Sequence, residues 1–491
     1  MVDFISVAIV LLAASSLLLP LLQLTKGGSW RLPGYVLALV LSAVLVLVGL
    51  STVSPTSVTW FGSLLSDDQL GGVFALVTVG VTLAVTVASF ETQRGSSNPV
   101  YYSLLSFTAL GMLLLSYSQD LLMLFVAWEL MSLPTYVLAG FDKKQRSNEA
   151  AVKYAIIGAM SSAIILYAIS LAYGLTGSTQ ISAVVQGFYQ LLATQSHSSA
   201  LASLAILLFV AGFGFKMAIV PFHMWIPDAY EGAPTTVSTL LAAATKKAGF
   251  IAAIRVILAI TTVYVLTRSP LFTMANVFAV LALLTMTVGN ISALTQRSMT
   301  RLLAYSSIAQ AGYILIGFVA YSANPGSTAA TIGMTGAILH VINHAVLTSA
   351  AFLVAALVIM QLKRDDLGAY NGLGRGMPIT AFTMSVAMLA LAGVPPLNGF
   401  WSKLLLFLSV ANGPFGWLAL AGILNSALSL GYYGWVVKRM YFDERESSER
   451  VAEPMWFVLI FAVLVGLIIG IGLFPQQAIN FASGAVSNIG H

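Results

Sequence analysis

Seven ionisable residues lie within stretches of sequence that are otherwise apolar. The acidic one is Glu129, and the basic ones are Lys153, Lys216, Lys246, Lys247, Arg255 and Lys403. Inside a bilayer each such charge costs at least about 2.5–3.5 kcal/mol on insertion scales, so these groups usually line a protein interior or a watery path. Burial disfavours the charged form of a titratable group and a nearby opposite charge favours it. Lysines and a carboxylate in this setting indicate proton or ion transfer.

The elements that must position these residues are membrane-spanning helices. Of the 491 residues, 58% are hydrophobic and only 8% are charged, whereas a soluble domain carries roughly 25% charged residues. Apolar stretches of about 20 residues recur from end to end, and each is long enough to cross a bilayer. The first stretch carries only Asp3 and lacks the basic leader of a signal peptide, so we expect it to be the first span.

We expect an all-α integral membrane protein with about fourteen transmembrane helices. The expected spans are 4–23, 33–51, 70–90, 100–117, 119–140, 150–175, 203–224, 235–261, 274–294, 301–321, 331–361, 378–411, 414–441 and 453–474.

Loops rich in lysine and arginine alternate along the chain with loops that have almost none. The loops after spans 1, 3, 5, 9, 11 and 13 hold fifteen of these residues: Lys26, Arg31, Arg94, Lys143, Lys144, Arg146, Arg297, Arg301, Lys363, Arg364, Arg375, Lys438, Arg439, Arg445 and Arg450. The loops of the other side hold only Arg268. Basic loops stay cytoplasmic, so the pattern predicts an even number of spans with both termini outside. The expected location is a prokaryotic plasma membrane.

Glu129 and Lys216 are the first candidates for a proton path. Glu129 lies about halfway along span 5. Its alternatives are a structural carboxylate paired with a lysine and a proton-pathway group. Lys216 lies in the middle of span 7, and Pro221 should break that helix one turn beyond it. A broken helix is tolerated at membrane depth only where protein or water satisfies its freed backbone groups, which favours an ion site beside Lys216.

Two adjacent lysines, Lys246 and Lys247, lie partway along span 8. Neighbouring helix residues point about 100° apart, so the two amines cannot face the same partner. We expect one to face the interior and the other to meet a second partner or the edge. Arg255, near the outer end, is expected to snorkel. For Lys153, near the cytoplasmic start of span 6, snorkelling and a relay role are equally compatible with its position.

Three histidines complete the set of candidates. His340 and His344 are four residues apart on one face of span 11. No acid or cysteine falls near them in the sequence, so a relay of neutral imidazoles fits better than a metal site. His223 lies nearer the membrane edge, where a packing role and a proton-path role are both open. The chain has no cysteine, which excludes disulfides and thiolate-held metals or iron–sulfur clusters within it.

Span 12 is too long for one straight crossing and contains Pro395 and Pro396, shortly before Lys403. It therefore predicts a second broken helix beside a second buried lysine. Spans 7 and 12 are each the fourth member of a five-helix block. Because five is odd, the blocks 100–261 and 274–441 enter the membrane from opposite sides, as in transporters with inverted repeats. Residues 1–99 would supply three further helices, and residues 442–491 a cytoplasmic loop and the last helix.

The second block lacks an acid that corresponds to Glu129. Span 10 offers Tyr305, Ser306, Ser307 and Gln310 in its place.

These residues resemble the antiporter-like membrane subunits of complex I and of Mrp-type sodium/proton antiporters. The resemblance covers roughly residues 100–440. Its motifs are Trp128-Glu129 with Pro134, Lys216 with the segment 221–229, the segment 232–238, the segment 301–307 with Gln310, and the segment 394–400 with Lys403. A lysine after the Pro-Pro motif, together with fourteen spans, is similar to the subunit N type.

The resemblance implies a proton channel in which Glu129, Lys216, Lys246 and Lys403 carry the relay. Lys153, His340, His344, His223 and Lys247 are further candidates, and Lys247 is an extra lysine that leaves the assignment on span 8 open. It also implies partner membrane subunits in a redox-driven proton pump of the NADH:quinone oxidoreductase type. Quinone, flavin and iron–sulfur clusters would lie in those partners, and no cofactor, metal or nucleic acid is expected on this chain.

Four alternatives remain open at this point. Within the family they are the D-type component of an Mrp sodium/proton antiporter and a component of a membrane-bound hydrogenase or coenzyme F420 dehydrogenase. Outside the family they are a stand-alone secondary transporter for an organic solute and a structural scaffold. A solute transporter should hold a substrate-sized polar pocket, whereas the polar residues here are mostly titratable and spread along the spans. A scaffold would leave the midplane charges as unexplained costs of a few kcal/mol each.

Overall fold

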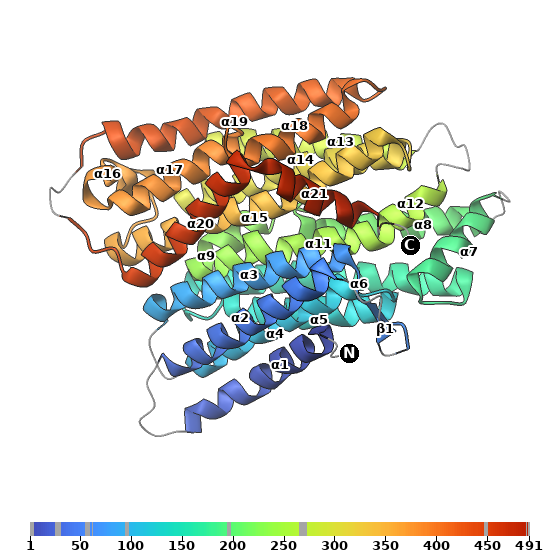
Figure 1. The fold of residues 1–491 in the computed structure, drawn as a ribbon, viewed down its shortest axis with the longest axis horizontal. Coiled ribbons are helices and arrows are strands. Elements are labelled where there is room, and N and C mark those ends of the chain that lie inside the picture. Colours follow the sequence, from blue (N-terminus) through green and yellow to red (C-terminus); the bar gives the residue numbers. More distant parts are fainter. Residues whose placement is uncertain are drawn as a thin grey trace.

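A bundle of long, roughly parallel helices makes up the molecule (Figure 1). The computed structural model describes residues 4–24, 31–54, 59–60, 62–93, 98–193, 198–264, 273–445, 450–487 and 489. Lys26, Arg94 and Arg268 lie outside the described residues. Twelve described helices are long and apolar enough to cross a membrane. The expected spans 8 and 12 add to these, and both are interrupted helices.

The first three helices precede the region of the lysines. They are α1 (Phe4–Leu18, extended by a 3₁₀ turn over Leu19–Leu24), α2 (Leu32–Val53) and α3 (Gln69–Thr92). Between α2 and α3, the strands β1 (Thr59–Trp60) and β2 (Leu65–Ser66) pair antiparallel. The sequence analysis did not anticipate this small hairpin. The side chain of Asp68 caps α3 by accepting a hydrogen bond of 2.6 Å from the backbone N–H of Gly71.

The next group holds the expected spans 4 to 8. It comprises α4 (Asn98–Tyr117), α5 (Leu121–Ala139), α6 (Gln145–Thr176), α7 (Ile181–Ala193), α8 (Ser198–Met217), α9 (Ile226–Gly232), α10 (Thr235–Leu240), α11 (Lys246–Ala253) and α12 (Ala259–Tyr264). Two π-helical segments, Leu241–Thr245 and Ile254–Leu258, join α10, α11 and α12 into one irregular span. π-helical turns of this kind are frequent at functional sites.

The last group holds the expected spans 9 to 14. It comprises α13 (Met274–Leu294), α14 (Met299–Ala323), α15 (Thr328–Leu362), α16 (Leu373–Gly376), α17 (Pro378–Ala392), α18 (Asn398–Ala411), α19 (Gly416–Phe442), α20 (Met455–Leu473) and α21 (Pro475–Val486). A 3₁₀ turn (Leu367–Tyr370) precedes α16. The helices α17 and α18 are the two halves of the broken span 12.

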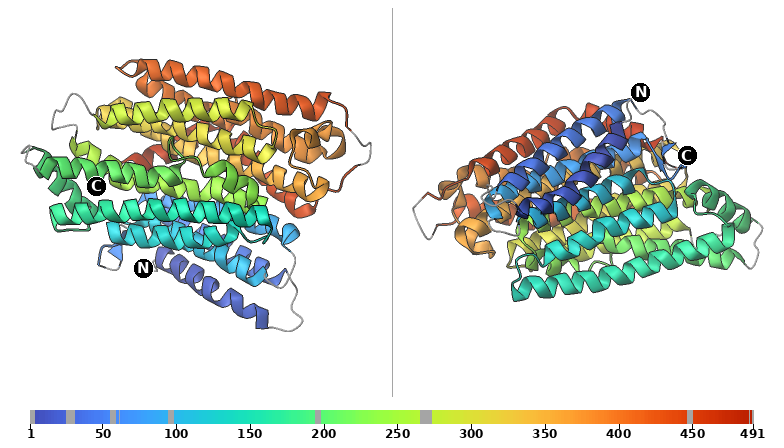
Figure 2. Two further views of the ribbon diagram at one scale, coloured as in Figure 1. Left: turned by 180° about the vertical axis from the view of Figure 1, so that it is seen from behind. Right: turned by 90° about the horizontal axis from the view of Figure 1, so that it is seen from below.

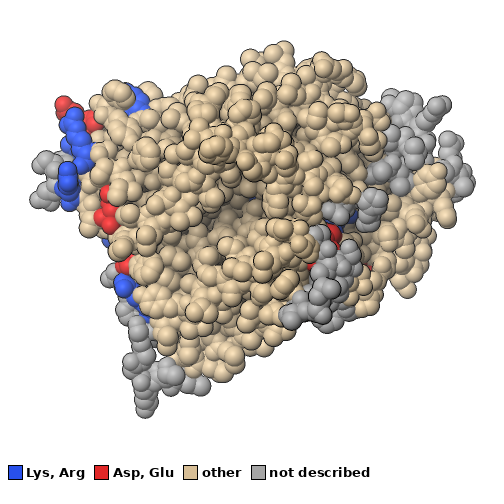
Figure 3. Space-filling view, in the orientation of Figure 1, with Lys and Arg blue, Asp and Glu red and all other residues tan. Residues whose placement is uncertain are grey.

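The start of α1 and the end of α21 both point toward the side of the bundle where the two chain ends are marked (Figure 1). This arrangement agrees with an even number of crossings. Seen from behind, α6 and α8 lie side by side on the opposite face (Figure 2). The space-filling view shows an uncharged band across the middle, with lysine, arginine and acidic side chains toward the ends (Figure 3). Such a band is what a bilayer requires of a surface that faces lipid.

Glycines let several pairs of helices approach closely, and two of these pairs are alike. A Cβ on Gly111 of α4 would clash with the backbone nitrogen of Met131 in α5, and one on Gly289 of α13 would lie 2.5 Å from that of Ala309 in α14. Small residues serve this purpose at membrane helix interfaces. Met131 and Ala309 are each the eleventh residue of their helix, so the two pairs occupy corresponding places in the two expected five-helix blocks. The repeat boundaries themselves remain a prediction.

Candidate functional site

Glu129 lies on α5 with its side chain half-buried, and it accepts a hydrogen bond from the hydroxyl of Ser162 in α6. The ion pairs of the described residues do not include one between Glu129 and Lys216. The described residues therefore do not show the alternative in which Glu129 is a structural carboxylate paired with a lysine. The two groups are connected through α5, because Ser132, one turn after Glu129, accepts a hydrogen bond of 3.1 Å from Lys216.

Lys216 lies on α8 and is buried against α5 and α6. Its amine also donates to the hydroxyl of Tyr154 at 2.8 Å and lies 5.7 Å from the centroid of the Tyr136 ring. Contacts of this kind between a cation and an aromatic ring stabilise the charged amine. Lys216 therefore has partners that suit an ammonium group, but each of them is neutral.

The break in span 7 comes earlier than the sequence predicted. The helix α8 ends at Met217, directly after Lys216, and Ala218 takes a positive φ of 66°. The turn that follows contains Pro221, whose peptide bond is cis. Two freed backbone groups find partners: the carbonyl of Phe215 accepts from the Trp225 indole at 3.1 Å, and the N–H of Val220 donates to Thr285 at 3.0 Å. Protein groups thus make the break tolerable at membrane depth.

Lys246 and Lys247 are both buried, and each has its own partner. Lys246 donates to the backbone carbonyl and the hydroxyl of Ser307 in α14, at 2.5 and 3.0 Å. Lys247 lies 2.5 Å from Nδ1 of His344 in α15 and 3.4 Å from the carbonyl of Ala242. The prediction that the two amines point to different partners is confirmed, and neither of them faces the edge.

The two histidines of α15 form the next part of the site. Their rings lie 6.1 Å apart with an interplanar angle of 4°. His340 also lies 2.9 Å from the hydroxyl of Ser402 in α18 and 3.0 Å from the amide oxygen of Gln310 in α14. Span 11 thus connects Lys247 of span 8 to the broken span 12.

Lys403 lies on α18, beyond the second break. That break is where the sequence predicted it: α17 ends at Ala392, α18 begins at Asn398, and the peptide bond between Pro395 and Pro396 is cis. The amine of Lys403 points back toward the break. There it donates to the carbonyls of Leu391 and Ala392 at 2.8 and 3.2 Å and to the Ser426 hydroxyl at 3.0 Å. The carbonyls that the break leaves free therefore hold this amine.

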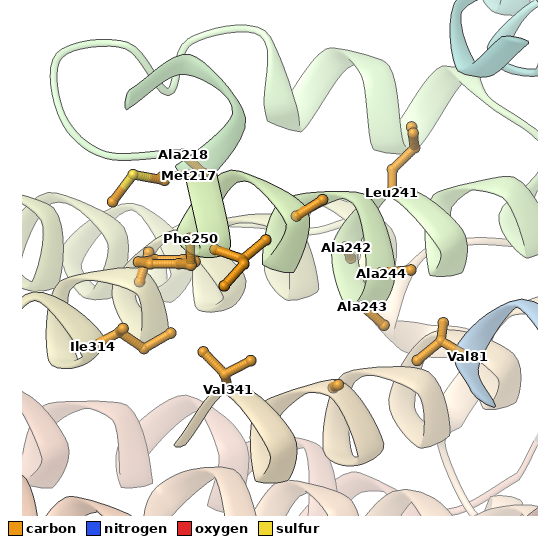
Figure 4. Close-up of a cluster of buried hydrophobic side chains, with 14 of the residues drawn as sticks. Val81, Met217, Ala218, Leu241, Ala242, Ala243, Ala244, Phe250, Ile314 and Val341 are labelled. Atoms are coloured by element: carbon orange, nitrogen blue, oxygen red, sulfur yellow. The ribbon is translucent and has the colours of Figure 1, made fainter. Parts of the chain in front are cut away.

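Apolar side chains enclose the polar groups at the centre. Figure 4 shows Ala242, Ala243 and Ala244 of the π-helical segment beside Val81 of α3, with Phe250 near the end of α8. Hydrogen bonds between buried groups are stronger in such surroundings than in water.

Arg255 does not snorkel, so that prediction was wrong. Its guanidinium is buried, donates to the carbonyl of Ser116 at 2.8 Å and forms an ion pair of 2.9 Å with Asp68. Asp68 precedes α3 by one residue, far away in the sequence, so no local pattern could have revealed the pair.

Lys153 and His223 occupy positions at the margin of the site. Lys153 is half-exposed and forms ion pairs with Glu149 at 2.7 Å and Asp228 at 3.1 Å. His223 is buried in the break of span 7, and its Nδ1 has no hydrogen-bond partner among the described residues. The relay roles considered for both residues remain predictions.

Lys153 belongs to a cluster of charges at the end of the bundle that the sequence predicts to face the cytoplasm. Arg301 of α14 donates to Asp228 at 2.9 Å and to Glu231 at 3.0 Å, and Arg146 of α6 is paired with Glu231. Partial burial acts to raise the pKa of Asp228, but the hydrogen bonds from Arg301 and Lys153 outweigh it and leave the pKa lowered. Asp228 is therefore an anion at neutral pH, and the cluster ties α6, α9 and α14 together.

Several polar partners escaped the sequence analysis. Ser132, Ser162, Tyr154, Ser402 and Ser426 are common residue types inside helices, so nothing marks them until the fold places them beside an amine or a carboxylate. Among the described residues, no group of three or more histidines and acids is placed to hold a metal ion.

Comparison with known proteins places this arrangement in a family. Residues 118–429, more than half of the chain, match the model of the NADH:quinone oxidoreductase/Mrp antiporter transmembrane family. The chain belongs to this family. Within it, the similarity is to subunit N, as the lysine after the Pro-Pro motif predicted.

Two curated relatives illustrate the similarity of this antiporter-like subunit. It is 40% identical over 451 residues to the F(420)H(2) dehydrogenase subunit N of Methanosarcina mazei, which covers 89% of this chain and 88% of the relative. It is 36% identical over 439 residues to the NADH-quinone oxidoreductase subunit N of Desulfitobacterium hafniense, with 85% and 86% covered.

Solved structures share the fold over nearly the whole length. A chain of respiratory complex I from Thermus thermophilus is 30% identical, with a TM-score of 0.80 over 97% of this chain and all of that one. A chain of the Mrp complex from Dietzia is only 21% identical, at a TM-score of 0.84 over 100% and 98% of the two chains, and shows the fold alone. The protein is thus an integral, multi-pass membrane subunit of the antiporter-like type.

Proposed function

We propose that this protein translocates protons as one membrane subunit of a redox-driven pump related to complex I. The observation that carries the proposal is the series of buried amines and imidazoles that crosses from α8 through α11 and α15 to α18. Its central contact is the 2.5 Å approach of Lys247 to His344, whose ring is parallel to that of His340. Titratable groups spaced in this way suit proton transfer, because each can hold a proton in turn.

The proposed cycle begins at Glu129. While Glu129 is ionised, its negative charge favours the protonated form of Lys216. Lys216 lies on α8 and donates to Ser132, which is on the same face of α5 as Glu129. When a neighbouring subunit disturbs that charge, Lys216 loses this support and releases its proton. Water molecules and the two histidines then carry a proton toward Lys246, Lys247 and Lys403, from which it leaves on the outer side.

The redox chemistry belongs to partner subunits in this proposal. The chain has no cysteine to hold an iron–sulfur cluster, and its relatives carry names of subunits of quinone- or F420-linked complexes. The same two names leave the electron donor open between NADH and reduced F420. An Mrp antiporter is the weaker alternative, because the similarity to the Mrp chain is one of fold.

The assembly can be tested by purifying the chain with an affinity tag from its native membrane. Subunits with iron–sulfur clusters in the purified complex support the proposal. A purely hydrophobic assembly without them would support an Mrp antiporter. A monomer that takes up an organic solute would contradict both.

The transport step can be tested by measuring protons pumped per electron in Glu129→Gln and Lys216→Ala complexes. We expect pumping to fall strongly in both, since each change removes a titratable group from the path. Lys144→Ala is the control, because that lysine is an exposed residue of a cytoplasmic loop. Normal pumping in both Glu129→Gln and Lys216→Ala would rule out the proposed relay.

A further inference from the structure

A cavity of about 690 Å³ opens between the cytoplasmic ends of α13, α14 and α19. Arg297, Asp366 and Arg439 line it, and Tyr432 of α19 also borders it. A space of this size with charged walls admits water, because water needs room and several polar partners. We call this cavity the cytoplasmic vestibule. Water in it would reach the side chain of Tyr432.

Beyond Tyr432, the structure continues with two buried asparagines. The Tyr432 hydroxyl donates to the amide oxygen of Asn290 in α13 at 3.0 Å. The amide nitrogen of Asn290 donates to both the side-chain and the backbone oxygen of Asn425, each at 3.1 Å. The amide nitrogen of Asn425 in turn donates to Thr287 and to the carbonyl of Ala421. All three side chains of this Tyr–Asn–Asn cluster are buried.

Lys403 lies directly behind the cluster. Ser426, the neighbour of Asn425 in α19, accepts the hydrogen bond of 3.0 Å from the Lys403 amine. That amine also lies 4.5 Å from the centroid of the Tyr313 ring, whose hydroxyl is 3.4 Å from the amide nitrogen of Asn290. The cluster therefore separates the water of the vestibule from the surroundings of the last lysine of the relay.

The chemistry of the cluster suits insulation better than conduction. A carboxamide donates and accepts hydrogen bonds, but it has no proton that it exchanges readily at neutral pH, unlike an amine, imidazole or carboxyl group. The amide nitrogens and oxygens here are engaged with each other and with the backbone. A satisfied network of this kind is rigid.

We propose that Asn290, Asn425 and Tyr432 form a proton barrier between the cytoplasmic vestibule and Lys403. The inference rests on the proposed function, because a barrier is needed only if Lys403 passes protons outward. Without it, Lys403 would exchange protons with the cytoplasm, and protons that had reached it would return to the side from which they came.

The absence of cysteine from the chain allows a direct test of access. A single cysteine is introduced at Ser426, next to Lys403, in the complete complex in inside-out vesicles. A charged, membrane-impermeant thiol reagent is added from the cytoplasmic side, and labelling of this subunit alone is measured. Thr295→Cys, which lines the vestibule, is the positive control. We expect rapid labelling at position 295 and slow labelling at position 426.

Two substitutions at Asn290 then test the barrier itself. In the background of Ser426→Cys, Asn290→Ala leaves a polar gap that holds water, so labelling should become at least about tenfold faster. Asn290→Leu fills the same place with an apolar side chain of similar branching, so labelling should stay slow. Asn276→Ala, at an exposed position of the same helix, is the matched control. Asn425→Ala and Asn425→Leu repeat the comparison if the variants at Asn290 do not assemble.

Labelling needs no electron transfer, so its result does not depend on whether the subunit pumps. Fast labelling of Ser426→Cys without any further change would overturn the barrier and indicate an open path. Equal labelling in the Ala and Leu variants would also overturn it, as would an unreactive Thr295→Cys. Slow labelling at position 426 that Asn290→Ala accelerates, together with normal pumping in Lys216→Ala, would instead overturn only the proposed relay.

Discussion

The four central lysines have neutral partners. Lys216, Lys246, Lys247 and Lys403 bind hydroxyl groups, backbone carbonyls or an imidazole, and none of them forms an ion pair with a carboxylate among the described residues. An ammonium group without a counter-charge keeps part of the cost of its transfer from water. Such a group is suited to passing on its proton, whereas a locked ion pair would hold it.

Lys247 provides a test at the level of one residue. Lys247→Met keeps the length of the side chain and removes the contact with His344. A hydrogen bond to a charged group contributes about 1.5–3 kcal/mol, so we expect the rate of pumping to fall by roughly 10- to 150-fold. The measurement is the initial rate of vesicle acidification at a fixed rate of electron transfer. A pumping rate within about twofold of the unchanged complex would show that Lys247 lies outside the path.

A substitution at Arg255 tests whether this residue forms a buried ion pair instead of snorkelling. Arg255→Leu leaves Asp68, whose side chain is only 11% exposed, without its ion-pair partner, and the loss of a buried pair typically costs about 3–5 kcal/mol. We expect a clear fall in the melting temperature of the purified complex. Arg364→Leu is the control, because its pair with Asp366 is exposed and should contribute less than about 1 kcal/mol. Equal effects of the two changes would contradict a buried structural pair at Arg255.

At the level of elements, the sequence predicted the spans and the second break well, and it predicted the first break one turn too late. Charge alternation and apolar length are strong signals, and Gly and Pro mark the interruption before Lys403. The sequence analysis missed α7, although Ile181, Val184, Val185 and Phe188 have the spacing of an amphipathic helix. It also missed the π-helical segments and the end of α8 at Met217, because these depend on packing against neighbouring helices that no local pattern encodes.

The sequence predicted the titratable residues of the site but not the groups that hydrogen-bond to them. Lysines and histidines are conspicuous in an apolar span, and therefore Lys216, Lys246, Lys247, His340 and Lys403 could be singled out. The hydroxyl groups and carbonyls that hold them come from other helices. Their assignment needs the three-dimensional arrangement, as does the absence of a direct pair between Glu129 and Lys216 among the described residues.

The contact between α8 and α11 gives a prediction at this scale. A Cβ on Gly249 would lie 3.0 Å from the Cβ of Lys216 and from the backbone nitrogen of Met217. Gly249→Val should therefore push the two helices apart at Lys216, costing about 1–3 kcal/mol and lowering pumping. Gly174→Val in α6 is the control, since nothing lies within 4 Å of that position. If the two variants assemble and pump alike, the close approach has no bearing on the relay.

For the whole molecule, the two breaks and the two close helix pairs suggest one arrangement used twice. By the correspondence of Met131 and Ala309, Glu129 corresponds to Ser307 and Ser132 to Gln310. Ser307 accepts from Lys246, and Gln310 connects His340 to the carbonyl of Leu391, which Lys403 also binds. We propose that the second block has exchanged the carboxylate for neutral acceptors. Among the described residues, control would then enter at Glu129, whose side chain is half-buried on α5.

The central claim is that the buried lysines act in one path across both blocks. Proton pumping per electron in Lys216→Ala, Lys403→Ala and the double variant tests it most directly. Residues that serve one sequential path have strongly non-additive effects. The account therefore predicts that the double variant pumps no less than the more impaired of the two single variants. If instead the double variant loses the sum of the two single losses, the lysines serve separate paths and the account is wrong.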